Sequence, residues 1–230
     1  MTTSPASASA PLSGPVEDYL KVIFELETRL GVAETNLIAD ELRIAPASVS
    51  GMIRRLVEQG LISHERYRGV RLTSEGRRAA LRTIRRHRVI EAYLTTALNY
   101  PWDLVHDEAE RLEHAASDEL IDRMAAAIGE PTTDPHGAPI PTREGALDQR
   151  TLSPLDSVEP GTRVLVERVG DRDSTQLRYL AELGIVPGRI VEVLSRAPFE
   201  GPIALRVGRA TRTIGPALAK RILVARAPAD

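Results

Sequence analysis

Apolar side chains in the first third of the chain recur at intervals that predict three helices and a hairpin. Residues 15–29 carry them three or four positions apart, as an amphipathic helix does. Further helices are expected at 35–42 and at 46–59, where a proline suits the first turn. The stretches 61–66 and 70–73 alternate between apolar and polar and predict a β-hairpin. Three helices followed by a hairpin indicate a winged helix-turn-helix.

The rest of the chain is predicted to be helical at first and to form β-strands towards its end. A long helix is expected over 74–98, and shorter ones over 103–116 and 117–129. Residues 130–160 contain six prolines, which indicates an extended linker. Short Val- and Ile-rich runs separated by turn residues follow it, with one helix over 175–183. This pattern predicts a small β-barrel of the SH3 kind.

The fold class expected from these elements is mainly α with a small β part. The chain divides into a flexible tail (1–14), a winged helix-turn-helix domain (15–76), a helical domain (77–130), a proline-rich linker (131–154) and an SH3-like domain (155–230). The tail lacks the basic end and apolar stretch of a signal peptide, and no apolar run reaches the roughly 18 residues of a membrane span. A cytoplasmic location without a membrane partner is therefore expected.

Charge is distributed unevenly, although the net charge is only −2. Residues 43–91 hold twelve Arg against four Glu, a local net of +8, whereas residues 103–122 hold eight acids against one Arg, a net of −7. A basic segment followed by an acidic one suggests polyanion binding and then cation binding.

The third helix of the winged domain is expected to enter the major groove of double-stranded DNA. Small and hydroxyl side chains at its start suit close approach to bases, and the arginines that follow suit phosphate contacts. The candidate DNA-binding residues are Ala47, Ser48, Ser50, Gly51, Arg54, Arg55, Arg66 and Arg68. A helical bundle with merely solvated arginines is the alternative, and the hairpin directly after the third helix favours DNA binding.

Two helices carry a pattern of histidine and carboxylate that is typical of metal ligands. At about 100° per residue, the histidines and glutamates of residues 105–114 point into one sector: His106, Glu110, Glu113 and His114. His87 and Glu91 are also four residues apart on the preceding helix. With no cysteine in the chain, a site must use nitrogen and oxygen donors. Solvated, salt-bridging residues are the alternative, and His136, in a proline-rich loop, is expected to be incidental.

No sequence motif indicates catalysis, and the chain is not expected to be an enzyme. A Gly-rich phosphate loop, a Gly-x-Ser-x-Gly elbow and a His-Glu-x-x-His motif are all missing. A metal-dependent enzyme or a metal-storage bundle stays open as a competing class. Either would show turnover or high metal stoichiometry without specific affinity for DNA.

Several stretches together resemble the diphtheria toxin repressor family of metal-dependent regulators. They are EDYLKVIFEL at 17–26, RHR at 86–88, VHDEA at 105–109 with Glu113-His114, PIP at 139–141 and LGIVPG at 183–188. The resemblance implies that 77–130 is a dimerisation and metal-binding domain and that 155–230 is SH3-like (FeoA-like). It also implies a homodimer that represses transcription by binding a palindromic operator.

The resemblance further implies two separate metal sites. The primary site would comprise Asp18, Glu110, Glu113 and His114. The ancillary site would comprise His87, Glu91 and His106, completed by Asp173 and Gln176 from the SH3-like domain.

Two positions bear on the choice of metal. Iron-responsive members carry Met where this chain has Asp18 and Cys where it has Glu110. Carboxylates at both positions favour Mn²⁺, with Fe²⁺ as the alternative, because replacing sulfur removes a preference for softer ions. The chain departs from the family in two places: small manganese regulators have an acid in place of Lys21, and iron-responsive members have a Gln in place of Gly51. A binuclear site and their operator sequence are therefore not expected here.

Overall fold

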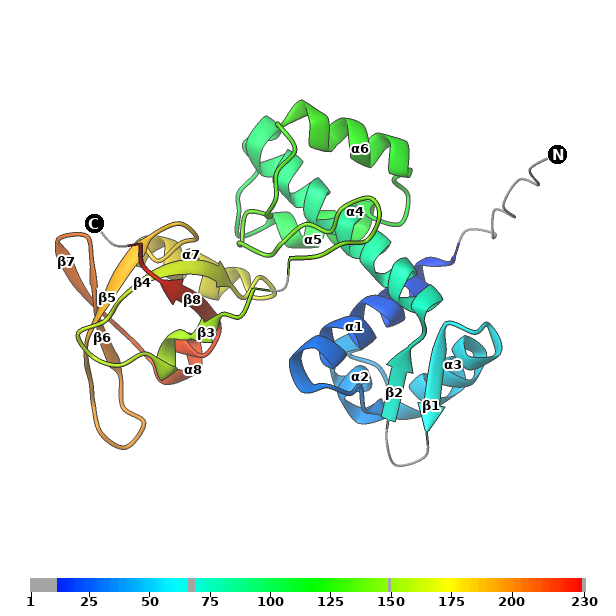
Figure 1. The fold of residues 1–230 in the computed structure, drawn as a ribbon, viewed down its shortest axis with the longest axis horizontal. Helices are drawn as coiled ribbons and strands as arrows, with labels where there is room; N and C mark the ends of the chain where they lie inside the picture. The colour runs from blue at the N-terminus through cyan, green and yellow to red at the C-terminus, as the bar shows by residue number, and fades with distance from the viewer. Residues whose placement is uncertain (1–11, 66–68, 149, 229–230) are drawn as a thin grey trace. The chain divides into compact units, whose positions relative to one another are not determined.

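A computed structural model describes residues 12–65, 69–148 and 150–228 of the chain (Figure 1). The chain forms two compact units, Met1–Ile84 and Arg85–Asp230, and the boundary falls within the long helix α4 (Ser74–Leu98). None of the helices in these described stretches combines the length and the apolarity needed to cross a membrane.

The first unit has the elements of a winged helix-turn-helix. Its helices are α1 (Gly14–Leu30), α2 (Thr35–Leu42) and α3 (Pro46–Glu58), followed by the antiparallel hairpin of β1 (Ile62–Glu65) and β2 (Gly69–Leu72). The helices form where the apolar positions recur at helical spacing, and α1 and α3 each have a proline in the first turn. The three predicted helices and the hairpin are thus found within one or two residues of their expected bounds.

Two glycines of the first unit occupy opposite environments. A Cβ atom added to Gly51, in the middle of α3, would meet nothing within 4 Å, whereas one added to Gly76 would lie 1.9 Å from the Leu61 carbonyl oxygen. We expect Gly51→Ala to raise the free energy of unfolding of this unit by about 0.5–1 kcal/mol, because glycine is a poor helix former. Gly76→Ala should lower it by about 2 kcal/mol or more through the backbone clash. Urea unfolding followed by circular dichroism measures both, and a shift of the same sign in both variants would contradict the prediction.

The helical part of the second unit consists of the C-terminal half of α4, α5 (Val105–Leu112) and α6 (Asp118–Ala127). Apolar residues from all three helices, including Val89, Val105 and Ile121, form one buried core. Helix α6 begins where the Ser117 hydroxyl accepts a hydrogen bond from the Leu120 amide. Helix α5 is shorter than the predicted 103–116, because the chain turns after Leu112.

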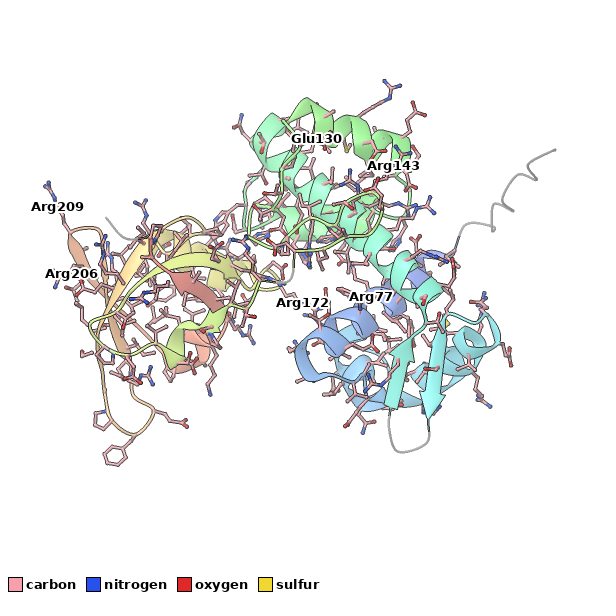
Figure 2. All side chains as sticks on the ribbon, viewed as in Figure 1. Arg77, Glu130, Arg143, Arg172, Arg206 and Arg209 are labelled. Carbon is pink, nitrogen blue, oxygen red and sulfur yellow. The ribbon has the colours of Figure 1, made fainter. Side chains whose placement is uncertain are left out.

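The β part of the second unit is a six-stranded antiparallel sheet. Its strands, in the order in which they pair, are β3 (Ser153–Pro154), β8 (Ile222–Arg226), β4 (Arg163–Val169), β5 (Ile190–Arg196), β6 (Ile203–Val207) and β7 (Ala210–Ile214). Helix α7 (Ser174–Leu183), a 3₁₀ turn (Leu155–Ser157) and the short α8 (Pro216–Ala219) complete it. Figure 2 shows Arg209 projecting outward from the turn between β6 and β7.

The predicted closed barrel is not found among the described strands. The sheet stays open between its edge strands β3 and β7, which pair with β8 and β6 but not with each other. Strand β3 is two residues long, and Pro154 has no amide hydrogen to donate, so this edge offers little backbone for a further pairing. The expectation of an SH3-like β domain stands in the coarser form of an open antiparallel sheet.

The loop that follows α6 is packed against the rest of the second unit. Thr133 and Pro139 form an isolated antiparallel bridge, and the Asp134 carboxylate oxygen Oδ1 accepts hydrogen bonds from the amides of His136 and Ala138. Strand β4 donates the Val169 amide to the His136 carbonyl oxygen. This part of the proline-rich segment therefore has a defined conformation, fixed by its own side chains and by β4.

Candidate metal centres and nucleic-acid interface

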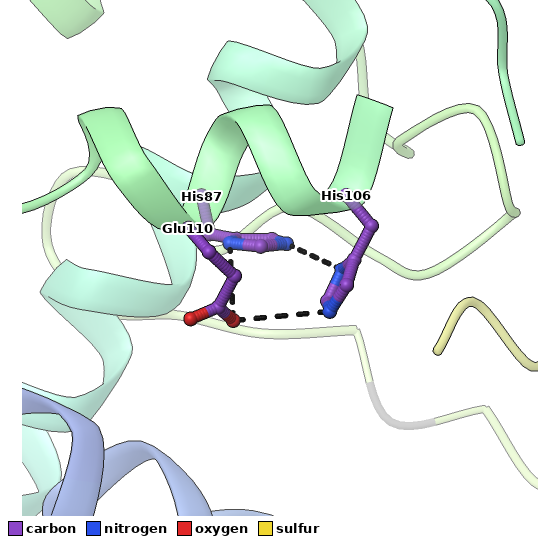
Figure 3. Close-up of side chains that lie close together, drawn as sticks. All are labelled: His87, His106 and Glu110. Carbon is purple, nitrogen blue, oxygen red and sulfur yellow. Dashed lines mark hydrogen bonds and ion pairs between the residues drawn. The ribbon is translucent and has the colours of Figure 1, made fainter. Parts of the chain in front are cut away.

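Helices α4 and α5 present two histidines and a glutamate to one another (Figure 3). His87 Nε2 lies 3.1 Å from His106 Nδ1, and Glu110 Oε1 lies 3.8 Å from both His87 Nδ1 and His106 Nε2. The helical period explains the arrangement, because His106 and Glu110 are one turn apart on α5. The three side chains can together offer two nitrogen donors and one oxygen donor to a cation.

Glu113 connects this group to the next donor along the chain. Its side chain is fully buried, with Oε2 2.5 Å from His87 Nδ1 and Oε1 3.6 Å from His114 Nε2. The sequence predicted two separate sets, with Glu110 and Glu113 in one and His87 in the other. In the structure, the members of the two sets that belong to the second unit form one contiguous network, and Glu110 is grouped with His87 and His106.

Glu91 places a carboxylate, a possible metal ligand, against both His87 and His106. Its side chain is buried, and Oε1 lies 3.0 Å from His87 Nε2 and 3.2 Å from His106 Nδ1. Burial acts to raise the pKa of the Glu91 carboxyl, but His87 and the neighbouring histidines outweigh it and hold that pKa well below its usual value. A carboxylate that stays ionised while buried is a suitable ligand for a divalent cation.

The two residues predicted to complete the ancillary site are engaged at the start of α7. Asp173 Oδ1 accepts hydrogen bonds from the amides of Thr175 and Gln176, and its Oδ2 accepts one from Gln176 Nε2. Gln176 Oε1 in turn accepts a hydrogen bond from Arg221. The Asp173 side chain thus caps α7, and the Gln176 side chain is hydrogen-bonded to it and to Arg221.

Asp171, two residues earlier, was missed by the sequence reasoning. Burial raises the pKa of the Asp171 carboxyl, but His106, His136 and Arg168 act more strongly in the opposite direction and bring it below the usual value. Its electrostatic coupling to His106 and Glu91 places this carboxylate near the histidine cluster. Asp171 lies in a loop, where no periodic pattern marks which side chains point inward.

Asp134 and His136 were also missed. His136 was expected to be incidental to the metal site; its side chain is fully buried, and its Nε2 lies 2.8 Å from the Trp102 carbonyl oxygen. Asp134 is 5% exposed, and together with Glu91 these residues form a second group with metal-ligand spacing in this unit. The signal in the sequence was the acid and the histidine two residues apart in Asp134-Pro135-His136.

Asp18 lies on α1 in the first unit, where it is half-buried. It belongs to the first unit, whereas the remaining predicted ligands belong to the second, and its part in a metal site is taken up as a proposal below.

The donor chemistry of the predicted residues fits a divalent transition metal. The available ligand atoms are carboxylate oxygens and imidazole nitrogens, and the chain has no thiol. Mixed nitrogen and oxygen sets of this kind bind Mn²⁺, Fe²⁺, Co²⁺, Ni²⁺ and Zn²⁺. The residues present therefore fit a metal of this group.

Helix α3 exposes the face that the sequence assigned to DNA. One face of α3 is buried within the first unit through Val49, Ile53 and Leu56, and the opposite face is exposed to solvent. The predicted DNA-binding residues on that face are all exposed: Ala47, Ser48, Ser50, Gly51, Arg54 and Arg55. Arg66 and Arg68 lie outside the described residues.

Comparison with known proteins finds three family models in succession along the chain. Residues 11–70 match the iron dependent repressor N-terminal DNA binding domain, residues 73–142 the iron dependent repressor metal binding and dimerisation domain, and residues 153–226 the FeoA domain. This succession defines a metal-dependent transcriptional repressor, a class of DNA-binding proteins that are not enzymes.

Individual relatives agree with these models. The iron-dependent repressor IdeR of Mycobacterium leprae is 33% identical over 193 residues, covering 77% of this chain and 82% of that protein. The diphtheria toxin repressor of Corynebacterium diphtheriae is 30% identical over 194 residues, covering 78% and 84%. A solved structure described as a manganese-dependent transcriptional repressor complex with manganese is 39% identical, covers 92% of this chain and all of that one, and superposes with a TM-score of 0.84. The chain belongs to the diphtheria toxin repressor family of metal-dependent transcriptional repressors.

Proposed function

We propose that this chain is a manganese-dependent repressor that binds a palindromic operator as a homodimer and controls metal-uptake genes. The observation that carries the choice of metal is the donor set. Every predicted ligand offers oxygen or nitrogen, with carboxylates at Asp18 and Glu110, and hard oxygen donors suit Mn²⁺. The 39% identity to a structure described as a manganese-dependent repressor supports the same choice.

The residues that would hold the metal fall into two sets. Asp18, Glu110, Glu113 and His114 form the primary set, and His87, Glu91 and His106 form the ancillary one. Asp173 and Gln176 stay candidates for the latter, and Asp171 joins them because of its coupling to His106. Bound there, the cation would supply positive charge to a crowded group of carboxylates. Because Asp18 lies on α1, shared coordination with the residues of α5 would link the winged helix domain to the metal domain.

Exposed leucines support the proposal of a homodimer. Leu98, Leu104 and Leu120, on or beside the helices of the metal-binding domain, are 59%, 42% and 44% exposed. Large apolar side chains left in solvent are a feature of interaction surfaces. A second copy of the chain would remove them from water.

An iron(II)-dependent repressor of the same family is the second candidate. The curated relatives named above are an iron-dependent repressor and the diphtheria toxin repressor, at 33% and 30% identity. The two candidates share fold and mechanism and differ only in the metal that activates DNA binding.

Binding of the metal-stripped full chain to promoter DNA distinguishes them. Fluorescence anisotropy with labelled fragments from metal-transporter promoters would be recorded while Mn²⁺ or, under anaerobic conditions, Fe²⁺ is added. We expect saturable binding with Mn²⁺ that is lost on chelation. Binding only with Fe²⁺ would establish the second candidate. Failure of both metals on a genome-wide pool of fragments would overturn the repressor assignment for this chain.

The Asp18→Ala variant tests the proposed link between the two domains. It should lose metal-dependent operator binding, by about 100-fold or more in the dissociation constant, because occupancy of the site would no longer favour the DNA-competent arrangement. Its dimer should stay intact in analytical ultracentrifugation. Normal operator binding by this variant would contradict the proposed role of Asp18.

A further inference from the structure

The turn between α2 and α3 contains an arginine in a backbone conformation that favours glycine. Arg43, directly after α2, has a φ of +55° and a ψ of +42°, in the left-handed region. Its amide donates to the Asp40 carbonyl oxygen at 3.2 Å, and the Ile44 amide donates to the Ala39 carbonyl oxygen at 3.0 Å. These two hydrogen bonds form a Schellman motif, in which the left-handed position is usually glycine. An arginine there is strained, because its Cβ atom lies too close to the following carbonyl oxygen.

Two other helices of the chain end in the same conformation, and both have glycine at the left-handed position. Gly31 follows α1 with a φ of +79°, and Gly184 follows α7 with a φ of +74°. The backbone geometry by itself therefore gives no reason for a side chain after α2. Strained residues of this kind concentrate at functional sites, which points to a role for the arginine side chain.

The side chain of Arg43 is available for a ligand. The residue is exposed, and no ion pair joins it to any other residue within the described part of the chain. Glu41, a neighbouring acid on α2, is paired with Arg29 instead, with 2.6 Å between its Oε1 and the arginine Nη2. The C-terminal end of the α2 dipole attracts a cation, but this attraction is weak at an exposed position. An anionic partner outside the chain would account for the arginine better.

The place of Arg43 in the helix-turn-helix puts it beside the DNA backbone. In this motif the recognition helix lies in the major groove with its first residues at the base edges, and the helix before it crosses the backbone. Here α3, which begins at Pro46, is the recognition helix, and α2 is the crossing helix. Arg43 therefore stands where the chain passes from the backbone of the DNA into the groove. The fork of a guanidinium group suits a phosphate at this point.

We propose that Arg43 contacts DNA, with its guanidinium bound to an operator phosphate next to the recognition helix. This inference rests on the proposed repressor function and adds to it a residue outside the exposed face of α3. A phosphate contact carries no base information, so Arg43 would raise the affinity for every sequence and fix how α3 lies in the groove. In a homodimer the contact would occur twice, once in each half of the operator.

The salt dependence of DNA binding tests the contact. The probe is a labelled duplex that the wild-type full chain selects from a random double-stranded library at saturating Mn²⁺, and KCl is varied from about 50 to 200 mM. Arg43→Asn removes the charge and keeps a residue that tolerates the left-handed conformation. We expect it to bind about tenfold or more weakly and to reduce the slope of log K against log salt by about 2, which is about 0.9 for each of two phosphates. Arg43→Lys keeps the charge and should restore most of the slope.

Arg29→Gln is the matched control, because this arginine of the same unit is already paired with Glu41. Its slope should equal that of the wild type. An equal slope in Arg43→Asn as well would overturn the contact. A second duplex with one changed base pair separates a phosphate contact from base reading. The ratio of the two affinities should be the same in Arg43→Asn and the wild type, and a changed ratio would overturn a phosphate contact.

Urea unfolding separates the contact from a structural role at the end of α2. Arg43→Gly should have a midpoint equal to or above that of the wild type, because glycine relieves the strain, and it should bind DNA as weakly as Arg43→Asn. A lower midpoint with an unchanged slope would assign Arg43 a purely structural role and overturn the proposal. If the wild type selected no duplex, the repressor function and the contact would both fail. Wild-type binding with an unchanged slope in Arg43→Asn would remove the contact alone.

Discussion

The Glu110→Gln variant should bind Mn²⁺ about 100-fold more weakly than the wild type and should lose operator binding at Mn²⁺ concentrations that saturate the wild type. Glu110 Oε1 lies 3.8 Å from a nitrogen of His87 and from a nitrogen of His106, and it is one of the carboxylates around these two histidines. Glutamine has nearly the same shape, so the change removes a charged ligand and little packing. A 100-fold loss corresponds to about 2.7 kcal/mol of binding free energy.

Glu108→Gln is the matched control for this prediction. Glu108 lies on the same helix and forms an ion pair with Arg111, but it is not one of the residues grouped around the histidines. Competition with a fluorescent chelator measures Mn²⁺ affinity for both variants. If the two variants lost affinity equally, the effect would be one of net charge on α5, and Glu110 would not be a ligand.

The metal-free protein should lose stability between pH 6.5 and 9 by about 3 kcal/mol. The pKa of His136 is raised in the folded state to about 9 from 6.5, by Glu91 and Asp134 acting against burial. A group whose folded pKa is raised stabilises the fold fully below its unfolded pKa, and this contribution is lost as the pH rises through the folded value. The shift of about 2.5 pH units corresponds to about 3 kcal/mol. At acid pH two carboxyls act in opposite senses: the contribution of Glu91, whose pKa is lowered, disappears as the pH falls, whereas protonation of Asp134, whose pKa is raised to about 6, stabilises the fold.

Trp102 allows this loss of stability to be followed by fluorescence next to His136. It is the single tryptophan of the chain, and its ring stacks on His136 with a centroid distance of 5.6 Å. Urea unfolding in the presence of a chelator, followed by tryptophan fluorescence from pH 6.5 to 9, should show the decline. His136→Gln should flatten it, whereas the same change at the exposed His64 on β1 should not. A decline that survives His136→Gln would assign it to other groups.

The helices, and the faces on which their candidate ligands lie, were predictable because a helix repeats. Spacings of three and four residues placed His87 and Glu91 on one face of α4, and His106 and Glu110 on one face of α5, as the structure has them. Fold class followed from the same periodicity in the first unit. The prediction of a barrel was wrong, because the sheet is open. Pairing between edge strands depends on strand lengths and long-range register, which alternation of apolar and polar residues alone does not encode.

Candidate ligands in loops could not be predicted, for a different reason. Asp134, His136 and Asp171 lie in segments without a period, so no pattern shows which of their side chains point inward. Their placement depends on residues far along the chain: His136 is hydrogen-bonded to the Trp102 carbonyl oxygen, and Asp171 is coupled electrostatically to His106. The contiguity of the two predicted ligand sets through His87 and Glu113 likewise depends on the distance between α4 and α5, which spacing along one helix cannot supply.

The loop that carries Asp134 and His136 is seated on β4 at a point where there is room for a hydrogen atom and nothing larger. A Cβ atom on Gly137 would lie 1.8 Å from the Glu167 carbonyl oxygen, and the φ of +87° already favours glycine. Any side chain there would have to separate the loop from the strand. Selection in cells for metal-dependent repression should therefore tolerate almost no substitution at position 137, although this residue offers no ligand atom of its own. At the same place the Val169 amide of β4 donates a hydrogen bond to the His136 carbonyl oxygen, so the FeoA domain is joined to the loop of the metal-binding domain without any ligand shared between them.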